Sequence, residues 1–362
     1  MKANIREYRF GVNYTPTQGW WYCWNDFCAD AIARDLDSIK LLDADHIRIM
    51  LIWPYFHPNP SAVSQAHLER LRALMDLALE RELDVCVALF VGWLSGYKFL
   101  PPFQSDDSFY DLSRSGGAQE LYMKSVAEVV KDYGNFLGFD LGNELNCCWQ
   151  ADDLAEGDIW HNHMMRATSE LLLDGVHVNG VDHNPWFRPA TFSPANLAKT
   201  QRIIALHCWT YFTGALRRSG GDPFKPASVR LLASMAALAR SYAGDPQKPV
   251  WIQEYGMSEE WTNPADIPRF LQESTVHGIQ AGVHWFTWWA SHDLDRRYTF
   301  DVLEYSLGLV THDQQVKPQG RAFREIARSY RGRKPVDSVT IPVIPPPATL
   351  DMGATWKWLE KV

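Results

Sequence analysis

Two glutamates that each follow a short apolar run are the residues of this chain best suited to chemistry. The run 136–141 leads through Gly-Asn to Glu144, and the run 249–253 leads directly to Glu254. In a barrel of parallel strands, side chains at the carboxyl ends of different strands meet around one opening. Cleavage of a glycosidic bond needs one carboxylic acid to protonate the leaving oxygen, and one carboxylate to attack the anomeric carbon or to activate water. We therefore predict that the two glutamates form a catalytic pair; the alternative is that each is salt-bridged or solvated.

The charge of Glu254 predicts which of the two glutamates acts as the acid. An ionised Glu254 disfavours a second negative charge nearby, which predicts that Glu144 stays protonated and serves as the acid. Esterification of Glu254 by the sugar would remove that repulsion and let Glu144 act as a base toward water. Arg48 lies in the apolar run 45–52, where an unpaired charge is costly, so we expect it to pair with Glu254. The alternative is a structural ion pair elsewhere.

Further polar and aromatic residues lie where predicted strands end. Many of the 16 Trp residues cluster at these positions, and flat apolar faces beside polar groups suit sugar rings, although ordinary packing is the alternative. Asn143 can hydrogen-bond a sugar hydroxyl. The residues expected to bind substrate are Arg48, Asn143, His207, Tyr211, Trp288, Trp20, Trp21, Trp24 and Asn13.

These residues need eight strands to position them, and the chain alternates apolar runs with segments of helical periodicity. The expected strands are 8–13, 45–52, 84–91, 136–141, 176–181, 202–207, 249–253 and 281–288. The expected helices are 26–42, 64–81, 118–133, 158–173, 227–242, 267–277 and 316–330. This alternation predicts a single (β/α)8 TIM barrel in residues 1–335, with long loops on its carboxyl-terminal face. Residues 336–362 are expected to be a Pro-rich C-terminal extension packed on the barrel.

The order of the candidate residues resembles the clan A glycoside hydrolases, and most closely glycoside hydrolase family five. The resemblance implies that Glu144 is the acid/base, that Glu254 is the nucleophile, and that the anomeric configuration is retained. It rests on Asn143-Glu144 after the fourth strand, Glu254 after the seventh, Arg48 on the second, His207 on the sixth and Trp288 on the eighth.

Within that family, the stretches 11–16 and 305–310 are similar to bacterial β-mannosidases. That similarity implies an exo-β-mannosidase acting on short β-1,4-linked mannosides such as mannosyl-β-1,4-N-acetylglucosamine. The alternatives are an endo-β-1,4-mannanase or β-glucanase on the same barrel, or a non-catalytic carbohydrate-binding barrel. The family's His-x-Tyr on strand six is replaced here by His207-Cys208-Trp209, which leaves Tyr211 as the candidate hydroxyl beside the nucleophile.

The composition of the chain limits the classes of molecule that it is expected to bind. The formal charge of −8 over 362 residues argues against nucleic acid or an anionic membrane as the partner, and we expect a small oligosaccharide instead. No run of 18 apolar residues predicts a membrane span, and no signal peptide is visible. Six scattered cysteines do not suggest a disulfide framework, so a cytoplasmic protein is expected. No cofactor and no metal ion is expected, and the sequence does not indicate an oligomeric state.

Overall fold

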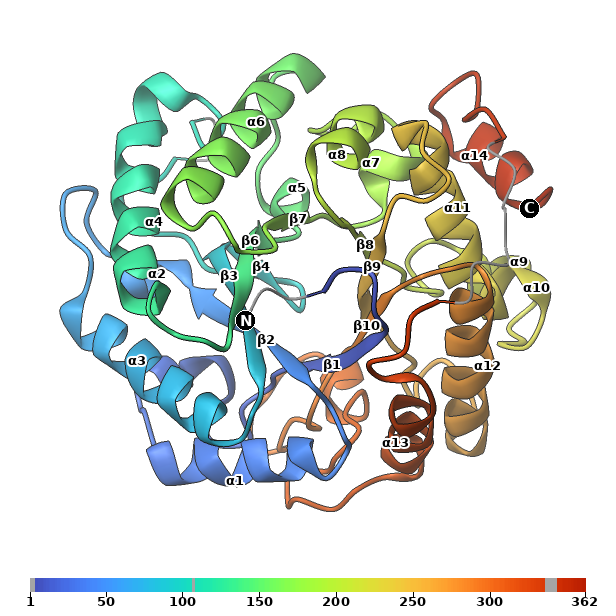
Figure 1. The fold of residues 1–362 in the computed structure, drawn as a ribbon, viewed down its shortest axis with the longest axis horizontal. Coiled ribbons are helices and arrows are strands. Elements are labelled where there is room, and N and C mark those ends of the chain that lie inside the picture. The colour runs from blue at the N-terminus through green and yellow to red at the C-terminus, as the bar shows by residue number, and fades with distance from the viewer. Residues whose placement is uncertain (1–3, 106–107, 336–343) are drawn as a thin grey trace.

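The computed structural model describes residues 4–105, 108–335 and 344–362, which form a barrel of eight parallel strands surrounded by helices (Figure 1). The predicted (β/α)8 barrel is therefore confirmed. Its strands are β1 (Arg9–Asn13), β2 (His46–Ile52), β3 (Asp84–Val91), β6 (Phe136–Asn143), β7 (Val178–Gly180), β8 (Ile204–His207), β9 (Val250–Tyr255) and β10 (Trp285–Trp288).

The hydrogen-bonded order of the strands runs β7-β6-β3-β2-β1-β10-β9-β8, so β7 and β8 are the ends of the ladder, and they lie beside one another to close the barrel. Strand β7 has three residues and is shorter than the predicted run 176–181. Just before it, His177 accepts a hydrogen bond from the backbone N–H of Phe139 and contacts the carbonyl of Leu172. The His177 side chain therefore supplies hydrogen bonds beside β7, where the short strand makes few bonds of its own.

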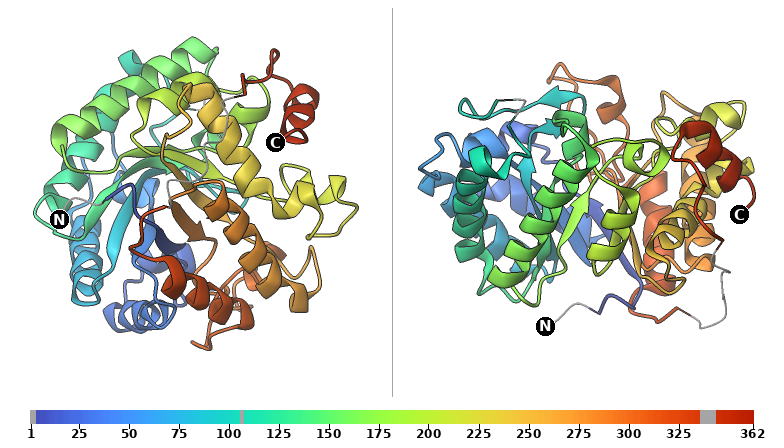
Figure 2. Two further views of the ribbon diagram at one scale, coloured as in Figure 1. Left: turned by 45° about the vertical axis from the view of Figure 1, so that its right-hand side comes forward. Right: turned by 90° about the horizontal axis from the view of Figure 1, so that it is seen from above.

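Helices cover the outside of the barrel, as two further views also show (Figure 2). Each predicted helix is present within a few residues, and α8, a seven-residue helix that begins at Pro194, was not expected. The covering helices are α1 (Ala29–Lys40), α3 (Gln65–Glu80), α4 (Gly117–Val130), α6 (Leu154–Leu171), α8 (Pro194–Thr200), α11 (Leu231–Ala243), α12 (Ile267–Gln280) and α13 (Pro318–Tyr330). Short helices in the loops are η1 (Trp20–Trp24), α2 (Trp53–Phe56), η2 (Leu112–Gly116), α5 (Leu145–Cys148), α7 (Asn184–Phe187), α9 (Ala215–Arg218), α10 (Pro226–Val229), η3 (Pro264–Asp266) and η4 (Val302–Tyr305).

The barrel interior is filled by side chains in two kinds of layer. Toward the amino ends of the strands, Trp251 and Trp285 pack with ring centroids 5.2 Å apart, among aliphatic side chains from the other strands. Because strand side chains alternate between the two faces, the next inward residues on the same strands lie one layer higher. That higher layer is polar and contains Arg48, whose side chain is completely buried. The polar layer therefore lies directly on packed apolar side chains.

Two loops on the carboxyl-terminal face have structure of their own. The connection after β3, one of the long loops expected on this face, contains a two-stranded hairpin, β4 (Trp93–Leu94) and β5 (Tyr97–Lys98). The connection after β10 contains η4 and reaches back toward this hairpin, and the two lie side by side at the top of the right-hand view of Figure 2.

The C-terminal segment ends in α14 (Met352–Leu359), which packs against α7 and α11. Trp356 and Trp358 of this helix are buried, and the guanidinium of Arg218 lies 4.7 Å from the centroid of the Trp356 ring. The expected boundary at residue 335 adjoins residues 336–343, which lie outside the described residues. Among the described helices, none has the length and apolar character that crossing a bilayer requires.

Candidate active site

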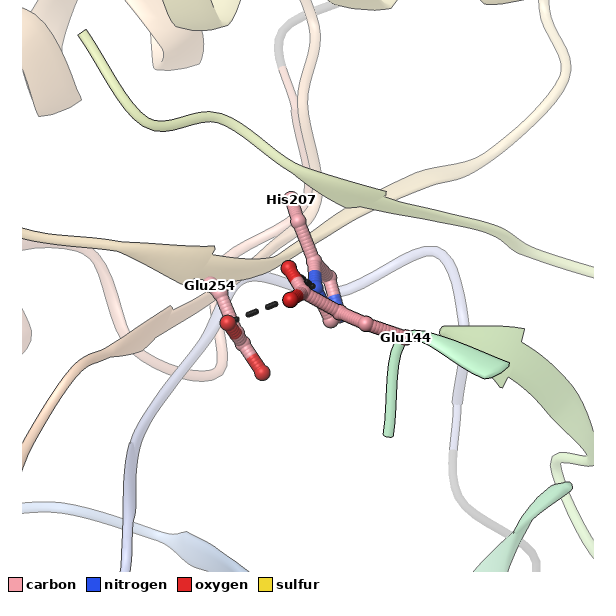
Figure 3. A group of neighbouring side chains, drawn as sticks. All are labelled: Glu144, His207 and Glu254. Atoms are coloured by element: carbon pink, nitrogen blue, oxygen red, sulfur yellow. Dashed lines mark hydrogen bonds and ion pairs between the residues drawn. The ribbon is translucent and has the colours of Figure 1, made fainter. Parts of the chain in front are cut away.

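Glu144 and Glu254 meet at the carboxyl-terminal mouth of the barrel (Figure 3). A carboxylate oxygen of each and a ring nitrogen of His207 all lie within 4.8 Å of one another. The His207 Nδ1 is 2.9 Å from Glu144 Oε1 and 3.3 Å from Glu254 Oε2. The structure thus brings together two glutamates that are 110 residues apart in the chain, from the ends of β6 and β9, with β7 and β8 between them, as the sequence predicted.

The backbone at Glu144 is itself unusual. Glu144 follows β6 with φ of 47°, in the left-handed region that a residue with a side chain seldom adopts, and its N–H donates to the carbonyl of Gly180. Strained backbone of this kind concentrates at functional sites, where the surrounding structure holds it in place. Here the turn between β6 and α5 directs the carboxylate over the barrel mouth.

Arg48 is the centre of a buried network that holds Glu254. Its Nη1 donates to Glu254 Oε1 at 2.7 Å and to Asn13 Oδ1 at 2.9 Å, and its Nη2 donates to Asn143 Oδ1 at 2.9 Å. A second carboxylate, Asp140, lies 2.7 Å from the guanidinium. The predicted pairing of Arg48 with Glu254 is therefore present, and two carboxylates share the buried cation. Burial raises the pKa of Glu254, while His207 and Arg48 act against that rise.

Asn13 and Asn143, both predicted to bind substrate, are engaged with the protein. Besides accepting from Arg48, Asn13 donates its amide to the carbonyl of Gln253 at 3.0 Å, and Asn143 donates to the carbonyl of Trp93 at 3.0 Å. Both amides thus hold the guanidinium in place. Whether Asn143 also meets a sugar hydroxyl stays a prediction.

Burial raises the pKa of Glu144 to about 8, and the nearby carboxylate of Asp182 adds to the rise, while Arg48 acts in the opposite direction. The expected cause, the charge of Glu254, is therefore not the main one. Asp182 lies just beyond β7 and is held by the side chains of Asn146 and Asn184. At neutral pH, Glu144 holds a proton.

His207 completes the connection between the two glutamates. Its Nε2 lies 3.0 Å from Gln253 Oε1, and a nitrogen that faces an amide oxygen carries the hydrogen. Burial lowers the pKa of His207, so the ring is neutral and its Nδ1 accepts a hydrogen bond. A protonated Glu144 supplies that hydrogen. A neutral His207 and a protonated Glu144 are therefore mutually consistent.

The hydrogen bond expected from Tyr211 to the nucleophile comes instead from Trp209. The Trp209 indole N–H donates to Glu254 Oε2 at 3.2 Å. Tyr211 is 54% exposed and stacks on the ring of Trp261, with centroids 4.9 Å apart and planes at 3°. Trp209 occupies the third position of the His-x-Tyr pattern. Its indole N–H reaches Glu254, the contact expected of a tyrosine hydroxyl at that position. The choice of Tyr211 for this contact was wrong.

Trp288 also has a different place from the one predicted. Its indole N–H donates to the carbonyl of Leu307, and its ring lies edge-on to Tyr255, among the residues between the barrel and the helices. Alternation along β10 puts Trp285 and Thr287 inside the barrel, and continuing it places Trp289, not Trp288, toward the mouth. The Trp289 ring is 6.4 Å from that of Trp209. The two-residue alternation of a strand could have identified Trp289 as the tryptophan that faces the mouth.

The Trp cluster after β1 is divided between two settings. Trp24 donates to the carbonyl of Met50 and packs edge-on to Phe56, so its predicted role in substrate binding is wrong: it is a core residue. Trp21 lies 6.2 Å from Trp289, and Trp20 packs beside Trp21. The indole nitrogens of Trp20 and Trp21 are buried without a protein hydrogen-bond partner, which leaves both as candidate donors to a ligand.

Six residues of the site were not identified from the sequence, although strand position provides a signal for several. Asp140 is a charged residue in a buried run, as Arg48 is, and the two neutralise each other. Asp182 follows a strand end, but the weakness of that strand obscured it. The six residues are Trp93, Asp140, Asp182, Trp209, Gln253 and Trp289.

The spacing of Glu144, His207 and Glu254 would also suit three ligands of a metal ion. The Arg48 guanidinium already provides a positive charge at 2.7 Å from Glu254 Oε1, where a cation would have to be accommodated beside it. Like charges at such separations repel strongly in a buried setting. The donor set therefore fits an acid and carboxylate pair better than a metal centre.

Comparison with known proteins identifies the family through solved structures. No family model matches the sequence, and no curated protein does. The GH5_18 protein of Streptomyces cattleya, solved in complex with Manb1-4GlcNAc, is 34% identical, with a TM-score of 0.86 over 91% of this chain and 82% of that one. GH5_18 from Bifidobacterium longum subsp. longum ATCC 55813, also in complex with Manb1-4GlcNAc, is 29% identical, with a TM-score of 0.85 over 91% and 80%. The resemblance to family five is confirmed: this chain belongs to the GH5_18 glycoside hydrolases, enzymes that hydrolyse glycosidic bonds.

Proposed function

We propose that this protein is a retaining exo-β-mannosidase that releases mannose from mannosyl-β-1,4-N-acetylglucosamine, with Glu144 as acid/base and Glu254 as nucleophile. The observation that carries the proposal is the close pair of carboxylates, in which burial favours a proton on Glu144 while the Arg48 guanidinium binds Glu254. Their nearest oxygens lie within 4.8 Å, whereas inverting enzymes separate the two groups by roughly 6.5–9.5 Å to admit a water molecule. The bound disaccharide in two GH5_18 relatives supports the choice of substrate.

In the first step, Glu254 attacks the anomeric carbon of the mannose unit. Arg48 and Trp209 hold its two oxygens, which fixes the carboxylate for attack and favours its ionised form. Glu144, protonated at neutral pH, transfers its proton to the departing O4 of N-acetylglucosamine. The bond between the anomeric carbon and O4 breaks as the ester bond to Glu254 forms, and no cofactor is required.

In the second step, Glu144 must act as a base toward water. Formation of the ester removes the negative charge of Glu254, so the nearby Arg48 guanidinium is less fully neutralised. Arg48 already lowers the pKa of Glu144, and that effect grows when its charge is less compensated. Glu144 then releases its proton more readily and takes one from the incoming water, which cleaves the ester with retention of configuration.

The test is hydrolysis of mannosyl-β-1,4-N-acetylglucosamine followed by NMR of the first-formed anomer. We expect β-mannose, and a loss of about 100-fold or more in kcat for Glu254→Gln and for Glu144→Gln. Glu80→Gln, on the outer helix α3, is the matched control and should keep wild-type rates. First-formed α-mannose, or Glu254→Gln within a few-fold of wild type, would contradict the assignment of the nucleophile.

A substrate panel separates the proposal from an endo-acting enzyme on the same barrel. β-1,4-Mannotetraose should lose one mannose at a time, and cellotetraose should not be cleaved. Internal fragments from either tetrasaccharide would show an endo-β-mannanase or β-glucanase that uses the same carboxylates. Binding of the sugars without turnover would show a non-catalytic barrel.

A further inference from the structure

The loops after β3 and after β10 are joined to each other across the mouth of the barrel. Ser95, at the tip of the β4–β5 hairpin, donates its hydroxyl to Glu304 Oε1 at 2.6 Å. Beside this bond, the Tyr97 ring stacks on Phe300, with centroids 4.0 Å apart and planes at 21°. These four residues form two adjacent contacts between segments about 200 residues apart, and we call them the β3–β10 clasp.

Each end of the clasp continues to one of the catalytic carboxylates. On the β3 side, the Trp93 indole donates a hydrogen bond to Glu144. On the β10 side, Glu304 Oε2 accepts from the Trp289 indole at 3.2 Å. Trp289 packs against Trp209, which donates to Glu254, so contacts lead from one glutamate to the other through the clasp.

The strand order shows which part of the mouth the clasp closes. In the barrel, β3 and β10 are separated by β2 and β1, so a bridge between their loops passes over the ends of these two strands. The loops after β7 and β8 lie on the other side of the carboxylates and take no part in the clasp. Tyr211 and Phe212, after β8, are both about half exposed. We therefore assign the path of a sugar chain beyond the carboxylates to the β7–β8 side.

The clasp is constructed from specific local features. Ser95 and Gly96 have φ of 50° and 83°, the pair of left-handed residues that a tight two-residue hairpin turn requires. Glu304 is 6% exposed, and both of its oxygens accept hydrogen bonds, as a buried carboxylate needs. The loop after β1 supports the same segment, because the Gly19 N–H donates to the Tyr298 hydroxyl and Trp20 packs on Phe300.

We propose that the β3–β10 clasp makes the enzyme exo-acting: Ser95, Tyr97, Phe300 and Glu304 close the groove beyond the terminal sugar, so that only one mannose unit fits between the clasp and the catalytic carboxylates. This inference rests on the proposed function and assigns its chain-end specificity to particular residues. A longer chain would have to pass through the Ser95–Glu304 hydrogen bond and the Tyr97–Phe300 stack to place an internal bond at Glu144.

The experiment compares the wild type with a double variant, Ser95→Gly with Tyr97→Ala. Glycine tolerates the left-handed backbone at residue 95 while removing the hydroxyl, and alanine removes the stacked ring. Tyr97→Phe keeps the ring and is the matched control. The substrates are reducing-end-labelled β-1,4-mannotetraose and mannosyl-β-1,4-N-acetylglucosamine, with products separated by chromatography and unfolding temperatures recorded for every variant.

We expect the wild type and Tyr97→Phe to release mannose alone from the tetrasaccharide. The double variant should also release mannobiose, because a second mannose unit then fits beyond the terminal one. A folded double variant that releases only mannose would contradict the role of the clasp and leave the proposed function intact. If the double variant does not fold, Ser95→Gly alone decides by the same product analysis.

Two outcomes in the wild type separate this inference from the proposed function. A wild-type protein that cleaves no β-mannoside contradicts the proposed function itself. A wild-type protein that cleaves β-1,4-mannotetraose internally contradicts both the exo assignment and the clasp, because the groove is then open with the clasp in place.

Discussion

The carboxylate of Asp182 should set the pH above which the enzyme loses activity. Removing its negative charge in Asp182→Asn makes ionisation of Glu144 less unfavourable, so the pKa of Glu144 falls from its value of about 8. Glu144 must be protonated to act as the acid, so the alkaline limb of the kcat/KM profile should move to lower pH. Asparagine retains a side-chain oxygen for Asn146, which limits the structural change.

The size of the effect follows from the order of the causes. Burial accounts for the largest part of the rise from 4.5 to about 8, and Asp182 comes second. Loss of one nearby like charge then corresponds to about one pKa unit, or about 1.4 kcal/mol. At pH 8 the wild type is about half protonated and the variant about one-tenth, so kcat/KM should fall about fivefold, while at pH 6 both stay mostly protonated and the rates should agree.

The assay is kcat/KM for mannosyl-β-1,4-N-acetylglucosamine between pH 5 and 9, because this ratio reports the pKa values of the free enzyme. Glu80→Gln removes one negative charge on the outside of the barrel and should leave the profile in place. An alkaline limb that is unmoved in Asp182→Asn would refute the coupling between the two carboxylates. A limb that moves to higher pH would show that Asp182 acts on Glu144 in some other way than by its charge.

Three further predictions concern the polar layer. Trp209→Phe should lower kcat about 10- to 100-fold by removing the hydrogen bond to Glu254, whereas Tyr211→Phe should leave kcat unchanged; equal rates for both would contradict the role of the indole. Arg48→Met should reduce the free energy of unfolding by about 3–5 kcal/mol, measured with urea, and should move the acid limb of kcat/KM upward because the pKa of Glu254 rises further. Gly180→Ala should reduce kcat without changing the anomeric outcome, because its methyl group would overlap Gln253 Oε1 below His207, and a wild-type rate would show that the network can shift without cost.

The sequence predicted the fold and the centre of the site because both depend on short-range patterns. Apolar runs that end in polar residues identify strand ends, and the barrel brings strand ends together, so Glu144, Glu254, Arg48 and His207 could be placed around one opening. A charged residue in a buried run requires a partner, and this reasoning found Arg48. The same reasoning applied to Asp140 would have found the second carboxylate on that guanidinium.

The residues that were missed or misplaced depend on which way a side chain points. Trp288 and Trp289 are adjacent and of the same type, and one faces the helices while the other faces the site. Composition cannot separate them, but the inward alternation of Trp285 and Thr287 can. The exchange of tyrosine for Trp209 was visible as a departure from a pattern, but only the position of its indole nitrogen at 3.2 Å from Glu254 shows that the contact persists.

The mouth of the barrel has two unlike halves, one beneath the clasp and one at the closure between β7 and β8. On the half over β1 and β2 the ladder is continuous, and the clasp joins the loops above it. On the other half, β7 and β8 are the ends of the ladder, and the catalytic network connects the strands there: the Gly180 N–H donates to Asp140, Glu144 donates its backbone N–H to Gly180, and His207 lies between Glu144 and Gln253. Under the proposed function, the half beneath the clasp holds the terminal sugar, and the half with the shortest strand receives the sugar that leaves. Glu144, the proposed proton donor to the leaving group, lies at the boundary between the two halves.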